Sequence, residues 1–212
     1  MGSAFHIGDG YCVTARHVID GNQILSIGRR DTSLKTQITA SGPVRTTTFG
    51  SLSHKVFEAP LFHPDDRVDV AIVRLGGRIG GGRGYPVSQL QPCVPLDRQV
   101  DLLTEGEYLL RPVVILGYPP IPWASDAHLV VFRGEVSAVI ENRNDRQRHF
   151  VISGMARGGF SGGPVMSTQG AVGIVTDSLG EDGMPTELGF ISATSVRAVR
   201  EIVQHHALRL KP

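Results

Sequence analysis

Short runs of β-branched residues, separated by turn residues, recur along almost the whole chain and constrain its fold more than any other feature. Gly contributes 26 of the 212 residues and Pro 13, and these residues favour turns and interrupt helices and strands. Runs rich in Val, Ile, Thr and aromatic residues between such turns are typical of strands. The runs that we predict as strands are 11–15, 46–49, 68–75, 113–118, 129–132, 135–140, 150–153, 164–167, 171–176 and 188–192. Many short strands at this spacing indicate an all-β sandwich or barrel.

A glycine-rich segment divides the predicted strands into two sets. Residues 76–84 read GGRIGGGRG, and glycine at this density cannot sustain a strand or a helix at an acceptable cost in backbone entropy. We therefore predict a loop or an inter-domain linker between an N-terminal and a C-terminal set of strands.

Helical periodicity is confined to the end of the chain. Val196, Val199 and Val203 repeat at spacings of three and four residues, with charged and polar residues between them. Thr194 or Ser195 can cap the first turn. We predict one helix over 195–208, lying on a β domain.

The charge balance disfavours nucleic acid and membrane surfaces as partners. Lys and Arg number 21 against 20 Asp and Glu, which leaves a net charge of +1, and the basic residues are scattered. Such a chain has no strong field to attract phosphate backbones or anionic lipids.

The two cysteines and the N-terminus carry little information about chemistry. Cys12 and Cys93 are too few and too far apart for a disulfide framework, and no C-x-x-C spacing suggests zinc, so we expect free buried thiols. The sequence shows no signal peptide and no apolar run long enough to span a bilayer. We expect a cytoplasmic location if Met1 is the natural start.

The segment 158–164, GGFSGGP, is the strongest candidate for chemistry. It places Ser161 on a tight glycine turn that leads into a strand, where backbone N–H groups can point into a common space. Acyl transfer needs such a pair of donors for the developing oxyanion. A glycine-rich surface turn with an incidental serine would look the same, so the motif needs partners elsewhere in the chain.

A nucleophilic serine needs a base, and the base needs an orienting carboxylate. Of the eight histidines, His17 follows a predicted strand directly and can face a cleft, whereas His205 and His206 lie on the predicted helix. Asp69 leads into an apolar strand, where an unpaired carboxylate would be costly, so a histidine N–H is its natural partner. Asp65 and Asp66 belong to a polar turn, and we expect them to be solvated.

Three blocks of the sequence together resemble the trypsin-like (chymotrypsin-fold) serine proteases. They are 13–18 (VTARHV), 69–75 (DVAIVRL) and 159–164 (GFSGGP), in the family order of histidine, aspartate and serine. The bacterial, HtrA-like branch is the more similar one, because 105–119 resembles the start of its second barrel, 133–139 its Gly-x-Val-Ser strand, and 173–176 and 189–192 the strands lining its cleft. No PDZ-like extension follows the predicted helix.

The resemblance implies an all-β fold of two six-stranded antiparallel β-barrels plus a C-terminal helix. The implied domains are an N-terminal barrel over 1–84 ending in the glycine-rich linker, a C-terminal barrel over 85–193, and a helix over 194–212 packed on the barrels. In the family a further strand precedes the one formed by residues 2–5, but here only Met1 stands before Gly2. Either the natural chain is longer, another segment closes the first barrel, or this barrel is incomplete.

The resemblance also implies a serine endopeptidase that works through an acyl-enzyme intermediate on peptide or protein substrates, without a metal or an organic cofactor. Ser161 would be the nucleophile, His17 the general base and then acid, and Asp69 the orienting carboxylate. The N–H groups of Gly159 and Ser161 would form the oxyanion hole. The residues implied for the specificity pocket are Met155, Ala156, Thr176, Asp177, Ser178 and Gly189.

Two departures from the family bear on activation and specificity. Phe160 stands where zymogen-type members carry an aspartate that pairs with a new N-terminus, and Val18 replaces a cysteine, so activation by N-terminal cleavage is not expected. Asp177 stands where the family usually carries an apolar residue, and the cleavage preference therefore stays open.

Alternative functions follow from the same motifs. The pattern Gly159-x-Ser161-x-Gly163 also fits the nucleophile elbow of α/β-hydrolases, with Asp182 and His205 as partners. That fold would need alternating strands and helices, and it leaves the blocks around His17 and Asp69 unexplained. A trypsin-fold module that binds peptides with weak or no catalysis, and an esterase, remain as alternatives.

Overall fold

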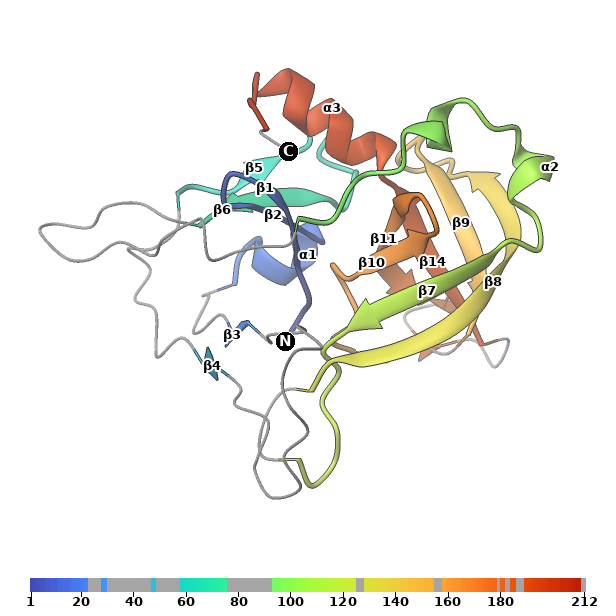
Figure 1. Cartoon of the computed structure of the whole chain (residues 1–212), viewed down its shortest axis with the longest axis horizontal. Coiled ribbons are helices and arrows are strands. Elements are labelled where there is room, and N and C mark those ends of the chain that lie inside the picture. The colour runs from blue at the N-terminus through green and yellow to red at the C-terminus, as the bar shows by residue number, and fades with distance from the viewer. Residues whose placement is uncertain are drawn as a thin grey trace, which may run out of the picture.

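A computed structural model describes residues 1–22, 28–29, 47–48, 58–75, 93–124, 128–154, 158–178, 180–181, 184–185 and 189–210. Strands predominate in this part of the chain, and the helices are short (Figure 1). The first half contains β1 (Phe5–Gly8), β2 (Tyr11–Thr14), α1 (Arg16–Ile19), β3 (Gly28–Arg29), β4 (Thr47–Thr48), β5 (Leu61–Phe62) and β6 (Ala71–Arg74). The second half contains the 3₁₀ helix η2 (Arg98–Asp101), α2 (Glu105–Tyr108), β7 (Pro112–Gly117), β8 (Val130–Glu141), β9 (Arg148–Ser153), β10 (Pro164–Ser167), β11 (Gly170–Ser178), β12 (Gly180–Glu181), β13 (Met184–Pro185), β14 (Phe190–Ser195) and α3 (Arg197–His205).

The strands of the second half close into a six-stranded antiparallel barrel in the order β10-β11-β14-β9-β8-β7, with β7 bonded back to β10. This confirms the predicted barrel of the C-terminal half. Two predicted strands, 129–132 and 135–140, are one continuous strand, β8. Gly134 causes no turn between them: it lies opposite Val113 of β7, and an added Cβ would stand 2.6 Å from the Ser153 carbonyl oxygen. The glycine therefore permits a close approach inside the barrel.

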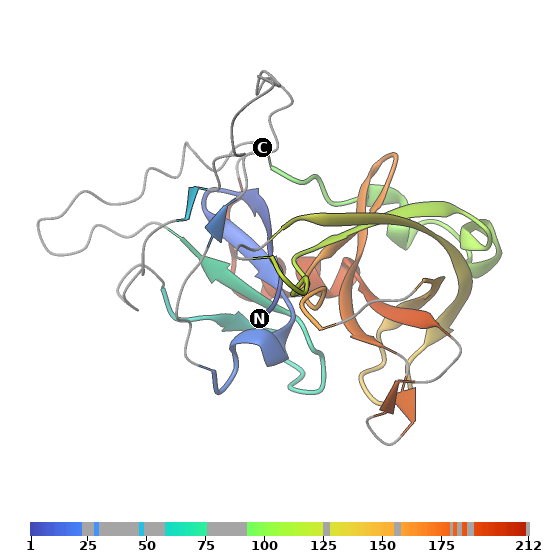
Figure 2. The same ribbon diagram turned by 90° about the horizontal axis from the view of Figure 1, so that it is seen from below.

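The first half forms a four-stranded antiparallel sheet in the order β1-β2-β6-β5. The two-stranded ladder of β3 and β4 is separate from it. A six-stranded first barrel is thus not what the described residues form. The remaining residues that would have to complete it, in 23–57 and 76–92, lie largely outside the described part of the chain, as does the boundary predicted at residue 84. Seen from below, the sheet and the barrel lie side by side (Figure 2).

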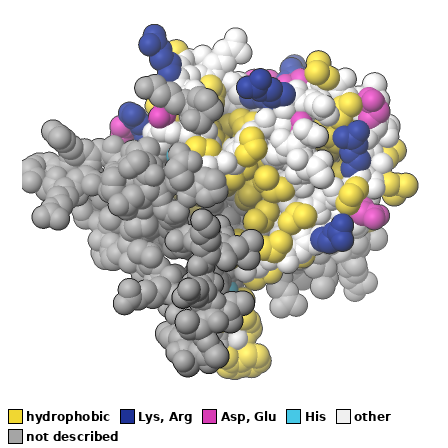
Figure 3. Space-filling view, in the orientation of Figure 1, with side chains coloured by type: hydrophobic (Ala, Val, Ile, Leu, Met, Phe, Trp, Pro, Cys, Tyr) yellow, Lys and Arg dark blue, Asp and Glu magenta, His cyan; other side chains and the backbone are white. Residues whose placement is uncertain are grey.

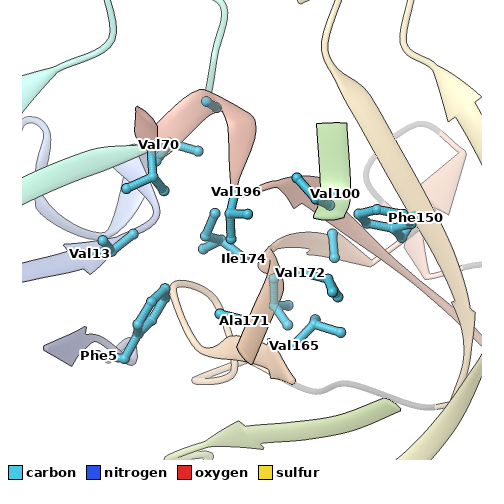
Figure 4. Close-up of a cluster of buried hydrophobic side chains, with 14 of the residues drawn as sticks. Phe5, Val13, Val70, Val100, Phe150, Val165, Ala171, Val172, Ile174 and Val196 are labelled. Carbon is cyan, nitrogen blue, oxygen red and sulfur yellow. The ribbon is translucent and has the colours of Figure 1, made fainter. Parts of the chain in front are cut away.

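One hydrophobic cluster runs through both halves. Val13 and Val70 from the sheet, Val165 and Ile174 from the barrel, and Val196 before α3 are all buried in it (Figure 4). Burial of an aliphatic side chain of this size contributes about 1.5–3 kcal/mol. Burial of apolar residues from both sets of strands thus explains why the two halves pack on a shared core.

The segment after the linker joins the two halves by backbone hydrogen bonds. The Val94 N–H donates to the His6 carbonyl of β1 at 2.7 Å, and the Asp97 N–H donates to the Ala171 carbonyl of β11 at 2.8 Å. Asp97 also caps η2, because its carboxylate accepts from the Gln99 N–H at 2.8 Å. The chain therefore crosses from sheet to barrel within four residues.

The C-terminal helix α3 starts at Arg197, two residues later than predicted, because the strand β14 continues to Ser195. Its inner face buries Ala198, Val199 and Ile202. Glu201 accepts hydrogen bonds from the buried His63 at 2.8 Å and from Gln147 of the β8–β9 turn at 2.9 Å. Helix α3 consequently ties the first half to the second through one carboxylate, and it lies above both in Figure 1.

Replacement of Glu201 by Gln tests this link. Burial raises the Glu201 pKa, but hydrogen bonds from His63, Gln147 and Arg197 outweigh it and lower the pKa below its usual value. The stabilisation is thus fully present above the unfolded-state pKa of about 4.3 and is lost as the pH falls through the folded-state value. We expect Glu201→Gln to lower the free energy of unfolding by about 1.5–3 kcal/mol at pH 7. Urea denaturation at pH 7 and pH 3 checks this: the difference from the wild type should shrink at pH 3, and an equal difference at both would contradict it.

Hydrophobic side chains gather on the face shown in Figure 3. Separately, Leu110 and Trp123 are large hydrophobic residues that are exposed at the surface. Cys12 and Cys93 form no disulfide, as predicted, but both are only half-buried as residues. Burial of the thiol raises the pKa of Cys12 to about 12, and the nearby Cys93 makes a smaller contribution in the same direction.

In the described residues no helix has the length and apolarity needed to cross a bilayer.

Candidate active site

Strand pairing brings His17 and Asp69 together. Strand β2 runs antiparallel to β6 with Thr14 opposite Ala71, so the residues after β2 and those before β6 lie at the same end of the sheet. The single turn α1 begins there and carries His17. The Asp69 carboxylate accepts from the His17 backbone N–H at 2.8 Å with Oδ1 and lies 2.7 Å from His17 Nδ1 with Oδ2. Both carboxylate oxygens therefore hold the same residue.

This contact determines the tautomer of a neutral His17. An ionised carboxylate can only accept hydrogen bonds, so Nδ1 carries the proton and Nε2 keeps its lone pair. The His17 side chain is 51% exposed and that of Asp69 32%, so the imidazole reaches solvent while its partner is better covered. A base with this tautomer can take a proton at Nε2.

Ser161 lies in the glycine turn between β9 and β10, and this turn packs on the strand that leads to His17. Gly162 has a φ of +85°, which favours glycine. A Cβ added at Gly162 would stand 2.1 Å from the Ser3 carbonyl oxygen and 2.4 Å from Thr14 Oγ1. The residue next to Ser161 thus touches the end of β2, three residues before His17, and only glycine allows this approach.

The backbone N–H groups of the turn differ in whether they have a backbone acceptor. The Gly162 N–H donates to the Val175 carbonyl at 2.7 Å and the Gly163 N–H to the Phe160 carbonyl at 2.8 Å. Within the described part of the chain, neither the Gly159 nor the Ser161 N–H has a backbone acceptor. Gly159 adopts a φ of +102°. These are the two donors that the sequence predicts for an oxyanion hole.

Phe160 anchors the turn from its buried side. Its side chain is buried, packs edge-on to Phe132 with ring centroids 5.3 Å apart, and fills the space over Gly117, where an added Cβ would lie 2.4 Å from Phe160 Cδ1. A buried ring thus occupies the position of the zymogen-type aspartate, and hydrophobic packing holds the turn in place of an ion pair.

The predicted specificity pocket is described only in part. Met155 and Ala156 lie outside the described residues, and for Asp177 and Ser178 only the strand backbone is described. The Thr176 side chain is buried, with its hydroxyl 3.0 Å from that of Thr194. Gly189 lies at the start of β14, where its carbonyl accepts from the Gly154 N–H at 2.9 Å.

Two of the rival acid and base candidates, Asp65 and His206, have other partners. Asp65 bonds Arg67 through both carboxylate oxygens, and this side-chain hydrogen bonding holds the Asp65 pKa well below its usual range. His206 Nε2 lies 3.1 Å from the Phe62 carbonyl oxygen. Asp182 lies outside the described residues. The part of the chain that the structure describes holds no cluster of three His, Cys, Asp or Glu side chains suited to a metal ion.

Comparison with known families identifies the domain. The sequence model of the trypsin-like peptidase domain matches residues 2–174, which is most of the chain. The chain belongs to this family. His17, Asp69 and Ser161 all lie within the region matched by the model of the trypsin-like peptidase domain. Membership of this family makes the domain a serine endopeptidase, which is a hydrolase. No curated protein matches the chain by sequence.

Solved structures share the fold of this trypsin-like peptidase domain. The HtrA-type protease AlgW, determined with a decapeptide, is 18% identical, with a TM-score of 0.59 over 96% of this chain and 52% of that chain. The inactive form of the Rv3671c protease is 17% identical, with a TM-score of 0.55 over 96% of this chain and 83% of that chain. The chain thus spans about half the length of AlgW, and the likeness confirms the trypsin-like, HtrA-like fold.

Sequence reasoning missed two residues of the site, Ser3 and Thr14. Ser3 is buried, and its hydroxyl contacts Gly159, far along the chain. The Thr14 hydroxyl donates to the Ser3 carbonyl at 2.7 Å. A serine in a small-residue segment carries no signal of such contacts, because they arise only when the two halves pack together.

Proposed function

We propose that this domain hydrolyses peptide bonds through an acyl-enzyme intermediate, with Ser161 as nucleophile, His17 as general base and then acid, and Asp69 as the orienting carboxylate. The observation that carries the proposal is the pair of contacts between the Asp69 carboxylate and His17, 2.7 Å to Nδ1 and 2.8 Å to the backbone N–H. The glycine turn that contains Ser161 packs beside this pair. This arrangement supplies each group that acyl transfer to serine needs.

The chemistry follows from the geometry. Ser161 Oγ attacks the scissile carbonyl carbon as its proton passes to His17 Nε2, and the resulting oxyanion faces the Gly159 and Ser161 N–H groups. His17 then donates this proton to the leaving amine, so the C–N bond breaks and an acyl ester remains on Ser161. Water attacks the ester by the same route, which releases the acid and restores the serine. Asp69 stabilises the imidazolium in both steps.

A peptide or protein is the substrate class that the comparisons favour. The family is one of peptidases, and the AlgW structure of the same fold was determined with a decapeptide. His17 follows a strand of the first sheet, and Ser161 lies in a turn of the second half that packs on the end of that strand, so an extended chain laid across this junction would meet both.

Labelling with a fluorophosphonate probe tests the proposal, because the probe modifies only an activated serine. We expect stoichiometric labelling of the wild type and none of Ser161→Ala. Ser167→Ala is the matched control, since it removes a serine hydroxyl at the other end of β10, and it should label like the wild type. A folded wild-type protein that is not labelled would contradict the proposal and favour a peptide-binding module without catalysis.

Substrate hydrolysis separates a peptidase from an esterase. The peptidase proposal predicts cleavage of a denatured protein such as casein as well as of short p-nitrophenyl esters. Labelling and ester hydrolysis without cleavage of any peptide bond in a peptide library would favour the esterase.

A further inference from the structure

Ser3 occupies the junction between the strand that leads to His17 and the turn that carries Ser161. It is a buried residue, 4% exposed, and its backbone and hydroxyl make four hydrogen bonds. The hydroxyl donates to the Gly159 carbonyl at 2.6 Å and accepts from the Tyr118 N–H at 2.9 Å. The Ser3 N–H donates to the Ser161 carbonyl at 2.8 Å, and its carbonyl accepts from Thr14 Oγ1 at 2.7 Å.

We propose that Ser3 is a positioning residue for catalysis, which holds the oxyanion-hole turn in its active conformation and in register with His17. This inference rests on the proposed function of the site. It adds a residue near the start of the chain that touches neither substrate nor the reacting atoms, but binds the two residues whose N–H groups would stabilise the oxyanion.

Gly159 has more backbone freedom than any other type of residue would have at this position. A glycine can rotate about φ and ψ at little cost, and a rotation there would turn its N–H away from the position of the oxyanion. The φ of +102° therefore needs support from outside the turn. Ser3 supplies part of this support by bonding the Gly159 carbonyl, which holds the peptide plane on the C-terminal side of the residue and thereby limits the rotations that could turn its N–H away.

The second anchor is on Ser161 itself. The Ser3 hydroxyl binds the Gly159 carbonyl, and the Ser3 N–H binds the Ser161 carbonyl. Ser3 therefore holds both ends of the tripeptide 159–161. Packing closes the remaining side, because an added Cβ at Gly159 would lie 2.7 Å from the Tyr118 carbonyl oxygen. The turn is thus enclosed between Ser3, the end of β7 and the Phe160 ring.

The third link runs to the base. Thr14, the last residue of β2, is buried and holds the Ser3 carbonyl, and His17 follows three residues later. Ser3 therefore connects the strand bearing the base to the turn bearing the nucleophile across the junction of the two halves. Small displacements of catalytic groups slow the reaction, since a misplacement of about 1 Å can lower the rate of the chemical step by roughly 10²-fold.

Fluorophosphonate kinetics on Ser3→Ala test the proposal without knowledge of the natural substrate. Time courses at several probe concentrations give the affinity of the first complex, KI, and the rate of the chemical step, kinact. We expect kinact to fall by about 10- to 100-fold with KI unchanged, because the lost hydroxyl acts on the oxyanion hole and not on probe binding. Ser3→Thr keeps the hydroxyl and should recover most of kinact.

Ser167→Ala is the matched structural control. The Ser167 hydroxyl also accepts from a backbone N–H, that of Gln169 at 3.0 Å, and it lies within donor distance of the Gly170 carbonyl at 3.1 Å and of the Asp97 carboxylate at 3.0 Å. It lies at the far end of β10, so its loss should lower the melting temperature but leave kinact unchanged. A folded Ser3→Ala with wild-type kinact, or a fall no larger than that in Ser167→Ala, would overturn the positioning role.

A second variant, Thr14→Val, and labelling of the wild type distinguish failure of the Ser3 proposal from misfolding and from failure of the proposed function. If Ser3→Ala does not fold, Thr14→Val removes the hydroxyl that holds the Ser3 carbonyl at nearly constant volume. It should lower kinact severalfold, and an unchanged kinact there would overturn the role of Ser3. Failure of the proposed function has a different signature, because the wild type itself would then not be labelled.

Discussion

We expect Asp69→Asn to lower kcat by about 10⁴-fold while the protein stays folded. Asp69 accepts from both the backbone N–H and Nδ1 of His17, at 2.8 Å and 2.7 Å. An amide has one acceptor oxygen and one NH₂ donor, so it can satisfy the backbone N–H only by presenting NH₂ to the ring. Nδ1 must then be the acceptor, which leaves the hydrogen on Nε2 and removes the lone pair that takes the proton of Ser161.

Asp66→Asn provides the control for this loss. Asp66 is exposed and three residues away, and the contact that it makes to Arg16 uses its backbone carbonyl, which the substitution leaves in place. Steady-state hydrolysis of a p-nitrophenyl ester should therefore be normal for Asp66→Asn and almost absent for Asp69→Asn. Equal activity of both variants would exclude Asp69 as the residue that orients His17.

Removing the ring of Phe160 destabilises the fold and disorganises the site at the same time. Phe→Ala substitutions in cores cost about 3–5 kcal/mol, and for a chain of this size this corresponds to a fall in melting temperature of roughly 6–20 °C. Phe160 is 4% exposed and contacts both Phe132 and the Gly117 backbone directly beneath the nucleophile turn. We therefore expect Phe160→Ala to lose fluorophosphonate labelling even at temperatures where it remains folded.

Phe150→Ala separates the two effects. Phe150 is fully buried in the barrel and stacks at an angle on Tyr108, with ring centroids 5.0 Å apart, on a different strand from the turn. Its loss should lower the melting temperature by a similar amount, but labelling at 20 °C should stay near the wild-type rate. Calorimetry and labelling on the two variants check this, and normal labelling of a folded Phe160→Ala would contradict the anchoring role of the ring.

Most of the strands could be predicted because their signal is local. The run 164–167 is β10 as predicted, and 150–153, 171–176 and 113–118 differ from β9, β11 and β7 only at their ends. The break expected at Gly134 does not occur, because the same glycine that would suit a turn also suits a strand pressed against a neighbouring carbonyl. Short strands such as β1 and β5 have too few residues to show a period of their own.

The pair of His17 and Asp69 could also be predicted, since a buried apolar strand that begins with an aspartate requires a partner for it. The register of β2 against β6, which brings the two residues to one end of the sheet, is a property of the folded sheet. Other carboxylates nearby bind different partners, as Asp65 binds Arg67. In the sequence, only the polar residues around Asp65 distinguish it from Asp69.

The sequence by itself determined the class of fold and the family, and it singled out the three residues that we propose for catalysis, because each of these depends on residue type and local pattern. Only the tertiary structure decided what supports them: Ser3 on the Gly159 and Ser161 carbonyls, Phe160 under the turn, and Gly162 against Thr14. The physical reason is range. The residues of a nucleophile turn are adjacent in the sequence. The hydrogen bonds and packing that hold its backbone join residues that are distant in the chain, 156 positions apart for Ser3 and Gly159, and those bonds exist only after both halves share one core.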